Sequence, residues 1–137
     1  MKKLFFFLVL LTTLSCSEQN PAEQINQLAG YWEIIKVEMP DGSIREFGIS
    51  RTIDYITINE DGGVRLKVDP KLDGSFITSG KAEEFKLKIE GDRLRMYYQT
   101  PYDSWVETVI STKDSLLVVK NQDDKIYTYK VFKPFEL

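Results

Sequence analysis

The chain has 137 residues, a length that fits one domain preceded by a targeting segment. Its charged fraction of 28% and hydrophobic fraction of 42% indicate neither disorder nor a multi-span membrane protein, and its net charge of −3 makes nucleic acid a poor partner. Histidine is absent, which removes the commonest metal ligand and the commonest general base, and the single cysteine forms no internal disulfide.

The first sixteen residues have the pattern of an export signal. Residues 1–3 form a short n-region with two lysines, and residues 4–11 form an apolar run that is too short for a membrane span. Ser15 directly before Cys16 resembles a bacterial lipobox, in which the cysteine receives a diacylglycerol and becomes the new N-terminus. Two or more acyl chains, such as palmitate, anchor a protein stably where one chain is marginal. We therefore expect residues 1–15 to be a lipoprotein signal peptide and Cys16 to be lipidated.

The expected location follows from the same segment. An ordinary secretory signal with a chance cysteine is the alternative, but a lone free thiol in an exported chain is an oxidation liability that acylation removes. Ser17 after the cysteine resembles lipoproteins that are passed to the outer membrane in many Gram-negative bacteria. We expect a protein of the bacterial cell envelope, anchored in the outer membrane through its lipid and either periplasmic or surface-exposed.

A short helix follows the anchor. Residues 16–24 are expected to form the lipidated tether and the start of this helix, with Asn20 as the N-cap and Pro21 at the first helical position. The helix is predicted to run over residues 21–28, and Gly30 lets the chain turn into the first strand. The remaining residues, 25–137, are expected to form the folded domain.

From Gly30 onward the apolar residues recur with the period of two that is typical of strands. Strand 64–69 alternates Val64, Leu66 and Val68 with charged residues, and Phe85, Leu87 and Ile89 are expected to face inward from the strand after it. Residues 40–53 are predicted to form a long loop, and the sequence does not decide whether residues 44–47 form a short additional strand within it. The eight predicted strands cover residues 31–39, 54–59, 64–69, 83–90, 93–99, 105–111, 116–120 and 126–132.

The connections between these strands differ in length in a regular way. Those after the first and third strands are long and those after the fifth and seventh are moderate, whereas the others are tight turns. In an up-and-down arrangement the two groups lie at opposite ends, so one end is closed and the other carries loops. The predicted fold is therefore all-β, an eight-stranded up-and-down antiparallel barrel with a short N-terminal helix. An open sandwich or half-barrel is the alternative.

Two motifs carry a resemblance to a known family. Gly30 and Trp32 match the Gly-x-Trp motif that opens the first strand of lipocalins, preceded as in that family by a short helical turn. The pattern Phe85-x-Leu87-x-Ile89-x-Gly91-Asp92-x-Leu94, followed by Ser111-x-x-Asp114-x-Leu116, is similar to the small lipocalin-like domains of Gram-negative lipoproteins. The resemblance covers roughly residues 25–132.

The resemblance implies a structural role for Trp32. In lipocalins this tryptophan packs at the closed end beneath a basic residue of the last strand, for which the candidates are Lys130 and Lys133. Strict alternation places Trp32 and Val37 on opposite faces, so both point inward only if the first strand carries a bulge between them. We expect Trp32 to be a core residue without ligand contact.

The resemblance also implies a function. Lipocalins carry small apolar molecules, so a small hydrophobic ligand is expected in the barrel. The alternative is that large inward side chains fill the barrel, which then acts as a protein-interaction or inhibitor module on an envelope protein. Catalysis, a cofactor and a metal are not expected, because the cysteine is committed to the anchor and no serine lies in a nucleophile motif. The candidate ligand-lining residues near the loop-bearing end are Val37, Met39, Ile56, Val68, Phe85, Met96 and Tyr98.

Overall fold

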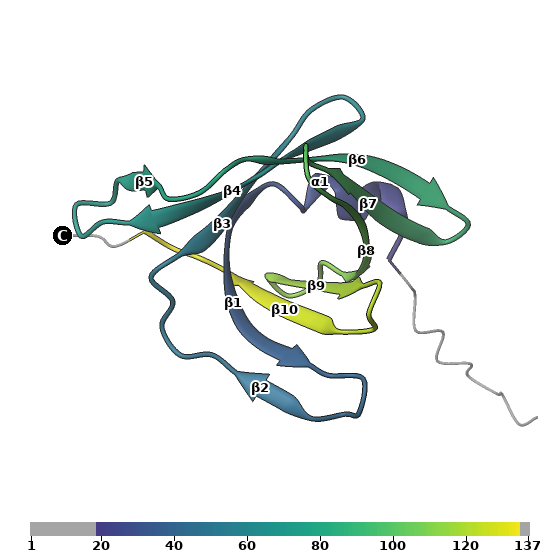
Figure 1. Cartoon of the computed structure of the whole chain (residues 1–137), viewed down its shortest axis with the longest axis horizontal. Coiled ribbons are helices and arrows are strands. Elements are labelled where there is room, and N and C mark those ends of the chain that lie inside the picture. Colours follow the sequence, from purple (N-terminus) through teal and green to yellow (C-terminus); the bar gives the residue numbers. More distant parts are fainter. Residues whose placement is uncertain (1–18, 135–137) are drawn as a thin grey trace, which may run out of the picture.

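The computed structural model describes residues 19–134, which form one short helix and ten strands (Figure 1). The predicted signal peptide and Cys16 lie outside the described residues. Within residues 19–134, no helix is long and apolar enough to cross a membrane. The elements are α1 (Pro21–Asn26), β1 (Gly30–Glu38), β2 (Ile44–Glu46), β3 (Ile53–Ile58), β4 (Gly62–Pro70), β5 (Phe76–Thr78), β6 (Glu83–Glu90), β7 (Arg93–Gln99), β8 (Ser104–Ser111), β9 (Leu116–Asn121) and β10 (Ile126–Val131).

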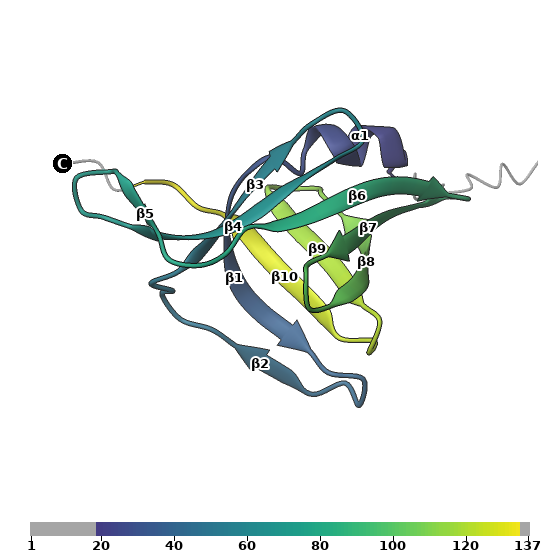
Figure 2. The same cartoon turned by 45° about the horizontal axis from the view of Figure 1, so that its top comes forward.

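Eight of these strands close into an antiparallel barrel. They follow one another in the order β1, β3, β4, β6, β7, β8, β9 and β10, and β10 pairs back onto β1. The extra strands β2 and β5 pair with β1 and β4, and both hairpins project from the ring in Figures 1 and 2. The predicted eight-stranded barrel and the short strand left open near residue 44 are therefore confirmed, whereas β5 lies in a segment that was predicted to be a loop.

Helix α1 lies at the closed end of the barrel. As predicted, Asn20 is its N-cap, and its side chain accepts a hydrogen bond of 2.9 Å from the Ala22 N–H. Gln19 precedes the helix and is bound to Thr112 through two hydrogen bonds of 3.1 and 2.8 Å. Thr112 follows β8 in one of the connections at the closed end, so the chain enters the barrel at that end.

The first strand carries the predicted bulge. The register of β1 against β10 shifts between Ile34 and Lys36. Trp32 before the shift and Val37 after it are both buried, with exposed fractions of 4% and 7%. The irregularity changes the alternation along β1, because an extra residue moves the following side chains to the other face. The bulge that is needed for Trp32 and Val37 both to point inward is therefore present.

Lys130 does not cover Trp32. Lys130 pairs with Glu33, and its Nζ lies 3.8 Å from Glu33 Oε2, whereas the neighbouring Val131 pairs with Trp32. Since successive residues of a strand face opposite sides, Lys130 lies on the face away from the indole. Lys130 therefore does not provide the expected cover, and the Trp32 Nε1–H donates a 2.9 Å hydrogen bond to the Leu28 carbonyl.

The predicted alternation of the third barrel strand is inverted. Arg65 is buried and bonds to side chains inside the barrel, and Lys67 reaches Asp54 from the same face. Val68 pairs with Ile53 and lies on the other face of β4. The expectation that Val68 lines the interior is therefore wrong. Arg65 faces inward because carboxylates there compensate its charge and phenols accept its hydrogen bonds, which hydropathy alone does not record.

Strand β6 extends beyond the barrel. Phe85 is buried and Leu87 packs against the core, as predicted. Ile89, however, is 51% exposed, because the hairpin of β6 and β7 projects from the ring, as Figure 2 shows. The expected inward position of Ile89 is therefore wrong.

Two glycines allow β4 to pass close to its neighbours. The turn from β3 consists of residues 59–61, and Gly62 and Gly63, expected in that turn, begin the strand instead. A Cβ at Gly62 would overlap the carbonyl oxygen of Phe85, and a Cβ at Gly63 would overlap the carbonyl oxygen of Thr57. Neither position admits a side chain without a shift of backbone.

Candidate ligand-binding site

The inward faces of the strands divide the barrel into two halves. The half toward α1 is apolar and contains the buried side chains of Leu28, Trp32, Leu94, Val109 and Leu117. The half toward the long loops is polar. Its inward positions include Asp54, Arg65, Lys67 and Glu107, which we call the Arg65 cluster together with Tyr98 and Tyr129.

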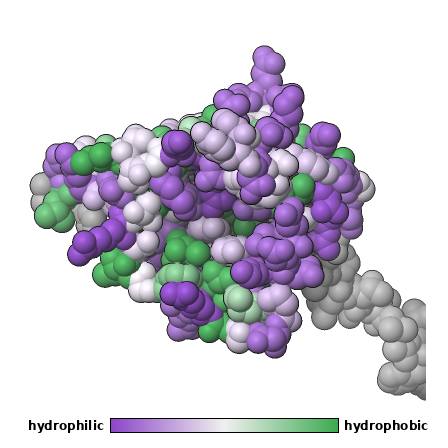
Figure 3. All heavy atoms as spheres, viewed as in Figure 1, coloured by the Kyte–Doolittle hydropathy of each residue, from purple (hydrophilic) through white to green (hydrophobic). Residues whose placement is uncertain are grey.

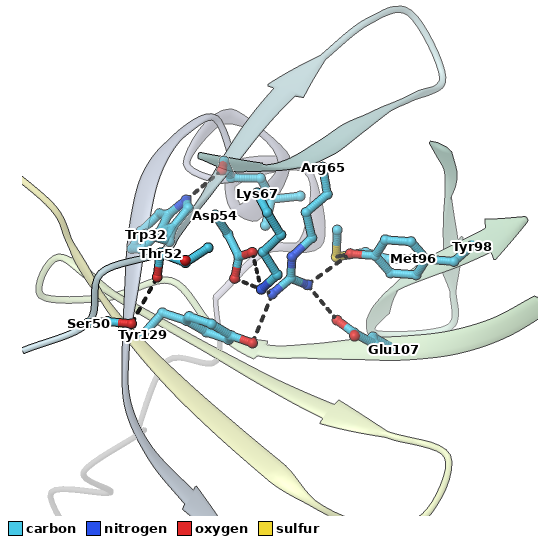
Figure 4. Close-up of polar contacts among 11 residues, drawn as sticks. Trp32, Ser50, Thr52, Asp54, Arg65, Lys67, Met96, Tyr98, Glu107 and Tyr129 are labelled. Atoms are coloured by element: carbon cyan, nitrogen blue, oxygen red, sulfur yellow. Dashed lines mark hydrogen bonds and ion pairs between the residues drawn. The ribbon is translucent and has the colours of Figure 1, made fainter. Parts of the chain in front are cut away.

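Arg65 is the centre of this cluster (Figure 4). Its Nη2 lies 2.9 Å from Asp54 Oδ2 and donates a 2.8 Å hydrogen bond to Tyr129 Oη. Its Nη1 lies 3.3 Å from Glu107 Oε2 and 3.1 Å from Tyr98 Oη. These partners come from β3, β10, β8 and β7, so a single guanidinium links strands on several sides of the barrel.

Lys67 connects the cluster to solvent. Its Nζ lies 2.5 Å from Asp54 Oδ1, so Asp54 is paired with two cations. The Asp54 side chain is 4% exposed, whereas that of Lys67 is 47% exposed. The ion pairs thus run from the middle of the barrel to a side chain that is exposed to solvent.

Burial and charge shift the pKa values within the cluster. Burial would raise the pKa of Asp54, but Arg65 and Lys67 outweigh it, and that pKa lies below its ordinary value. Burial raises the pKa of Glu107, and Arg65 offsets this only in part. Burial also raises the pKa of Tyr129 to about 12. At neutral pH we therefore expect a carboxylate at Asp54 and an un-ionised phenol at Tyr129.

Aromatic rings lie next to the cluster. The Tyr98 ring is stacked on Trp105 at 5.0 Å between centroids, and its other neighbour is Phe85 at 5.3 Å. Tyr127 packs against the core from β10, and its cross-strand partner is Val37 on β1. Trp105 and Tyr127 are only partly buried, so they are available at the open end.

The structure gathers five of the seven predicted lining residues inside the barrel. Ile56, Phe85, Met96 and Tyr98 belong to the core and are at most 3% exposed. Val37 is buried at the level of Tyr127, Met39 follows the end of β1, and Val68 lies outside the interior. Their role in ligand binding stays a prediction, since these side chains fill the space that they were expected to line.

The cluster itself was missed in the sequence. A signal existed for Glu107, because it shares its strand face with the apolar Trp105 and Val109, which places it inward. No comparable signal marked Arg65, whose neighbours Val64 and Leu66 are the more hydrophobic residues of the strand. Within residues 19–134, no three acidic, histidine or cysteine side chains are grouped so that they could hold a metal.

Comparison with known proteins gives two findings. A family model described as a lipocalin-like domain matches residues 28–119, from the residues before β1 into β9. The crystal structure of a lipocalin-like protein from Bacteroides uniformis is similar at a TM-score of 0.48 and 12% sequence identity, covering 77% of this chain and 99% of that one. A comparison with curated proteins gave no match.

Proposed function

The chain belongs to the lipocalin-like domain family, and from this premise we propose that it binds a small, largely apolar molecule at the open end of its barrel. The observation that carries the proposal is the Arg65 cluster, which lies inside the barrel and is joined to solvent through Lys67. Buried ion pairs often stabilise a fold less than apolar side chains of the same volume. A binding role therefore accounts for the cluster better than packing alone does.

The arrangement favours a ligand with one polar end. Trp105 and Tyr127 offer partly buried aromatic surface for its apolar part, and the half-exposed ammonium of Lys67 offers donors for its polar group. Arg65 is already paired with two carboxylates, so the cluster is close to neutral and does not demand an anion. A neutral hydrogen-bonding group, such as a hydroxyl or a carbonyl, suits these donors best.

A second candidate function rests on the filled interior. Phe85, Met96 and Tyr98 occupy the middle of the barrel at exposed fractions of at most 3%. A barrel filled in this way would act as a protein-interaction or inhibitor module in the envelope. Neither function requires catalysis, and we propose a binding protein rather than an enzyme.

We further propose that Cys16 carries a lipid that anchors the domain to the bacterial outer membrane. Support comes from the lipobox-like residues and from the entry of the chain at the closed end, where Gln19 is bound to Thr112. Only two residues separate Cys16 from Gln19. The open end would then face away from the membrane, and the ligand would arrive from the aqueous side. Cys16→Ala is expected to leave an unprocessed precursor, and normal cleavage of that variant would contradict the anchor.

The binding proposal is tested by native mass spectrometry of the purified protein before and after exposure to a membrane lipid extract. We expect a discrete added mass that is lost in Trp105→Ala. The matched control is Val106→Ala, the next residue of β8 on the outer face, which should keep the added mass. A bare protein mass under all conditions would contradict ligand carriage and favour the interaction module.

A further inference from the structure

A second hollow lies on the outside of the barrel wall. It is a cavity of about 630 Å³ between the loop that precedes β3, the end of β4 and the end of β10. This volume is within the range of small-molecule sites, about 300–1,000 Å³. We call it the outer groove, and its lining includes Glu33, Ile49, Arg51, Phe132 and Lys133.

One wall of the outer groove is held by an aromatic stack. Phe132 meets the edge of Phe76 at 6.2 Å between centroids, and Phe76 stacks on Tyr31 at 4.4 Å. Tyr31 in turn stacks on Tyr55 at 4.4 Å, so the series joins β5, β1 and β3 to the chain end after β10. Such contacts contribute about 0.5–1.5 kcal/mol each beyond their buried area, which makes this wall a fixed surface.

The groove exposes apolar side chains to water. Ile49 on its rim is 95% exposed, and the Phe132 ring lines the groove beside it. Figure 3 shows hydrophobic residues on this face between the β2 and β5 hairpins. Contiguous exposed apolar surface is typical of a binding surface, because covering it with an apolar group is favourable.

The rim of the groove is basic. Its charged residues are the cations Arg51, Lys130 and Lys133 and the anions Glu33 and Asp69. Both anions are engaged, since Glu33 accepts a hydrogen bond from the Ser50 N–H and pairs with Lys130, and Asp69 accepts one from Thr52. Within residues 19–134, Arg51 and Lys133 have no ion-pair partner. Two cations therefore remain available beside an apolar surface.

From this charge complementarity we propose that the outer groove binds a free fatty acid, with its acyl chain against Ile49 and Phe132 and its carboxylate at Arg51 and Lys133. The site is separate from the open end of the barrel. It takes an anion, whereas the nearly neutral Arg65 cluster favours an uncharged polar group. The two proposals therefore fail or succeed independently.

The test is isothermal titration of the purified protein with dodecanoate and, separately, with dodecyltrimethylammonium, both below their micelle concentrations. We expect saturable binding of dodecanoate and at least about tenfold weaker binding of the cation, because the rim charges attract one head group and repel the other. Equal binding of both amphiphiles would overturn the proposal.

Variants locate the site. Ile49→Asp is expected to weaken dodecanoate binding by about tenfold, and Arg51→Glu by about threefold to tenfold. The matched controls are Leu72→Asp and Lys71→Glu, exposed residues of the β4–β5 turn that do not line the groove, and they should bind as the parent does. All four side chains are exposed, so a thermal melt is expected to show an intact fold.

Trp105→Ala separates this site from the barrel. It should leave dodecanoate affinity unchanged while it abolishes the ligand adduct expected at the open end. Loss of dodecanoate binding in Trp105→Ala but not in Ile49→Asp would place the fatty acid in the barrel and overturn the outer groove.

Discussion

Arg65 on β4 forms an ion pair with Asp54 on the neighbouring strand β3, although the two residues are not directly opposite each other. The direct cross-strand partner of Arg65 on β3 is Ile56, yet its Nη2 lies 2.9 Å from the Asp54 carboxylate, two residues along that strand. The same guanidinium contacts Glu107 on β8 and Tyr129 on β10, strands that do not pair with β4. The Arg65–Asp54 pair therefore belongs to a set of contacts that holds the barrel together across its interior.

Removal of Asp54 is expected to destabilise the fold strongly. Asp54→Ala leaves Lys67 without its partner and Arg65 with one carboxylate in place of two. Breaking a buried ion pair costs about 3–5 kcal/mol, because a charge stays buried without compensation. The free energy of unfolding from urea denaturation measures the loss. Asp92→Ala, at the exposed β6–β7 turn, is the control and should change it by less than about 0.5 kcal/mol.

Glu107 should give the stability a distinct dependence on pH. Its pKa is raised by burial, so the folded state binds the proton more tightly than the unfolded chain does. The resulting stabilisation is complete below the unfolded pKa, about 4.3, and is lost as the pH rises through the folded pKa. Glu107→Gln keeps an acceptor for Arg65 but has no proton to lose. Relative to the parent, this variant should become more stable as the pH rises.

Urea denaturation between about pH 4 and pH 8 measures this difference. Asp54 has the opposite effect, since its lowered pKa contributes stability above the unfolded pKa that is lost as the pH falls through the folded value. Glu107→Gln keeps Asp54, so acid should still destabilise it. Parallel pH profiles of parent and variant would show that Glu107 does not titrate abnormally in the folded state.

Gly63 should tolerate no side chain. Gly63→Ala would place a Cβ against the Thr57 carbonyl and the Phe85 ring, and the strain of such overpacking is about 1–3 kcal/mol. We expect the midpoint of thermal unfolding to fall accordingly. Gly48→Ala is the matched control, since a Cβ there meets open space, and it should be neutral or slightly stabilising. Equal melting temperatures for the two variants would contradict the close approach of β4 to β3.

Alternation of apolar residues was sufficient to predict the eight barrel strands. The bounds of β6 and β7 agree with the prediction, since both strands have a strict period of two and are joined by a Gly-Asp turn. β5 was missed because three residues within a glycine-containing loop carry too little pattern. Its place depends on the stacking of Phe76 on Tyr31, a contact between residues far apart in the sequence.

The residues of the candidate site were much less predictable than the strands, and the orientation of Arg65 in β4 shows why. Hydropathy ranks Val64 and Leu66 above Arg65, so the strand was expected with its arginine in solvent. The observed orientation depends on Asp54, Glu107 and the two tyrosines, which four other strands supply. Compensation of a buried charge is a property of the folded barrel, so no local pattern within β4 could indicate it.

The indole of Trp32 is expected to contribute to the free energy of unfolding through its hydrogen bond as well as through its apolar packing. Trp32→Phe removes the donor to the Leu28 carbonyl and leaves that carbonyl buried without this partner, at a cost of about 1–3 kcal/mol in the free energy of unfolding. Trp105→Phe is the matched control, since Trp105 is only partly buried, and it should cost less. Urea denaturation followed by circular dichroism measures both. A smaller loss for Trp32→Phe than for Trp105→Phe would mean that the closed end is held by apolar packing alone.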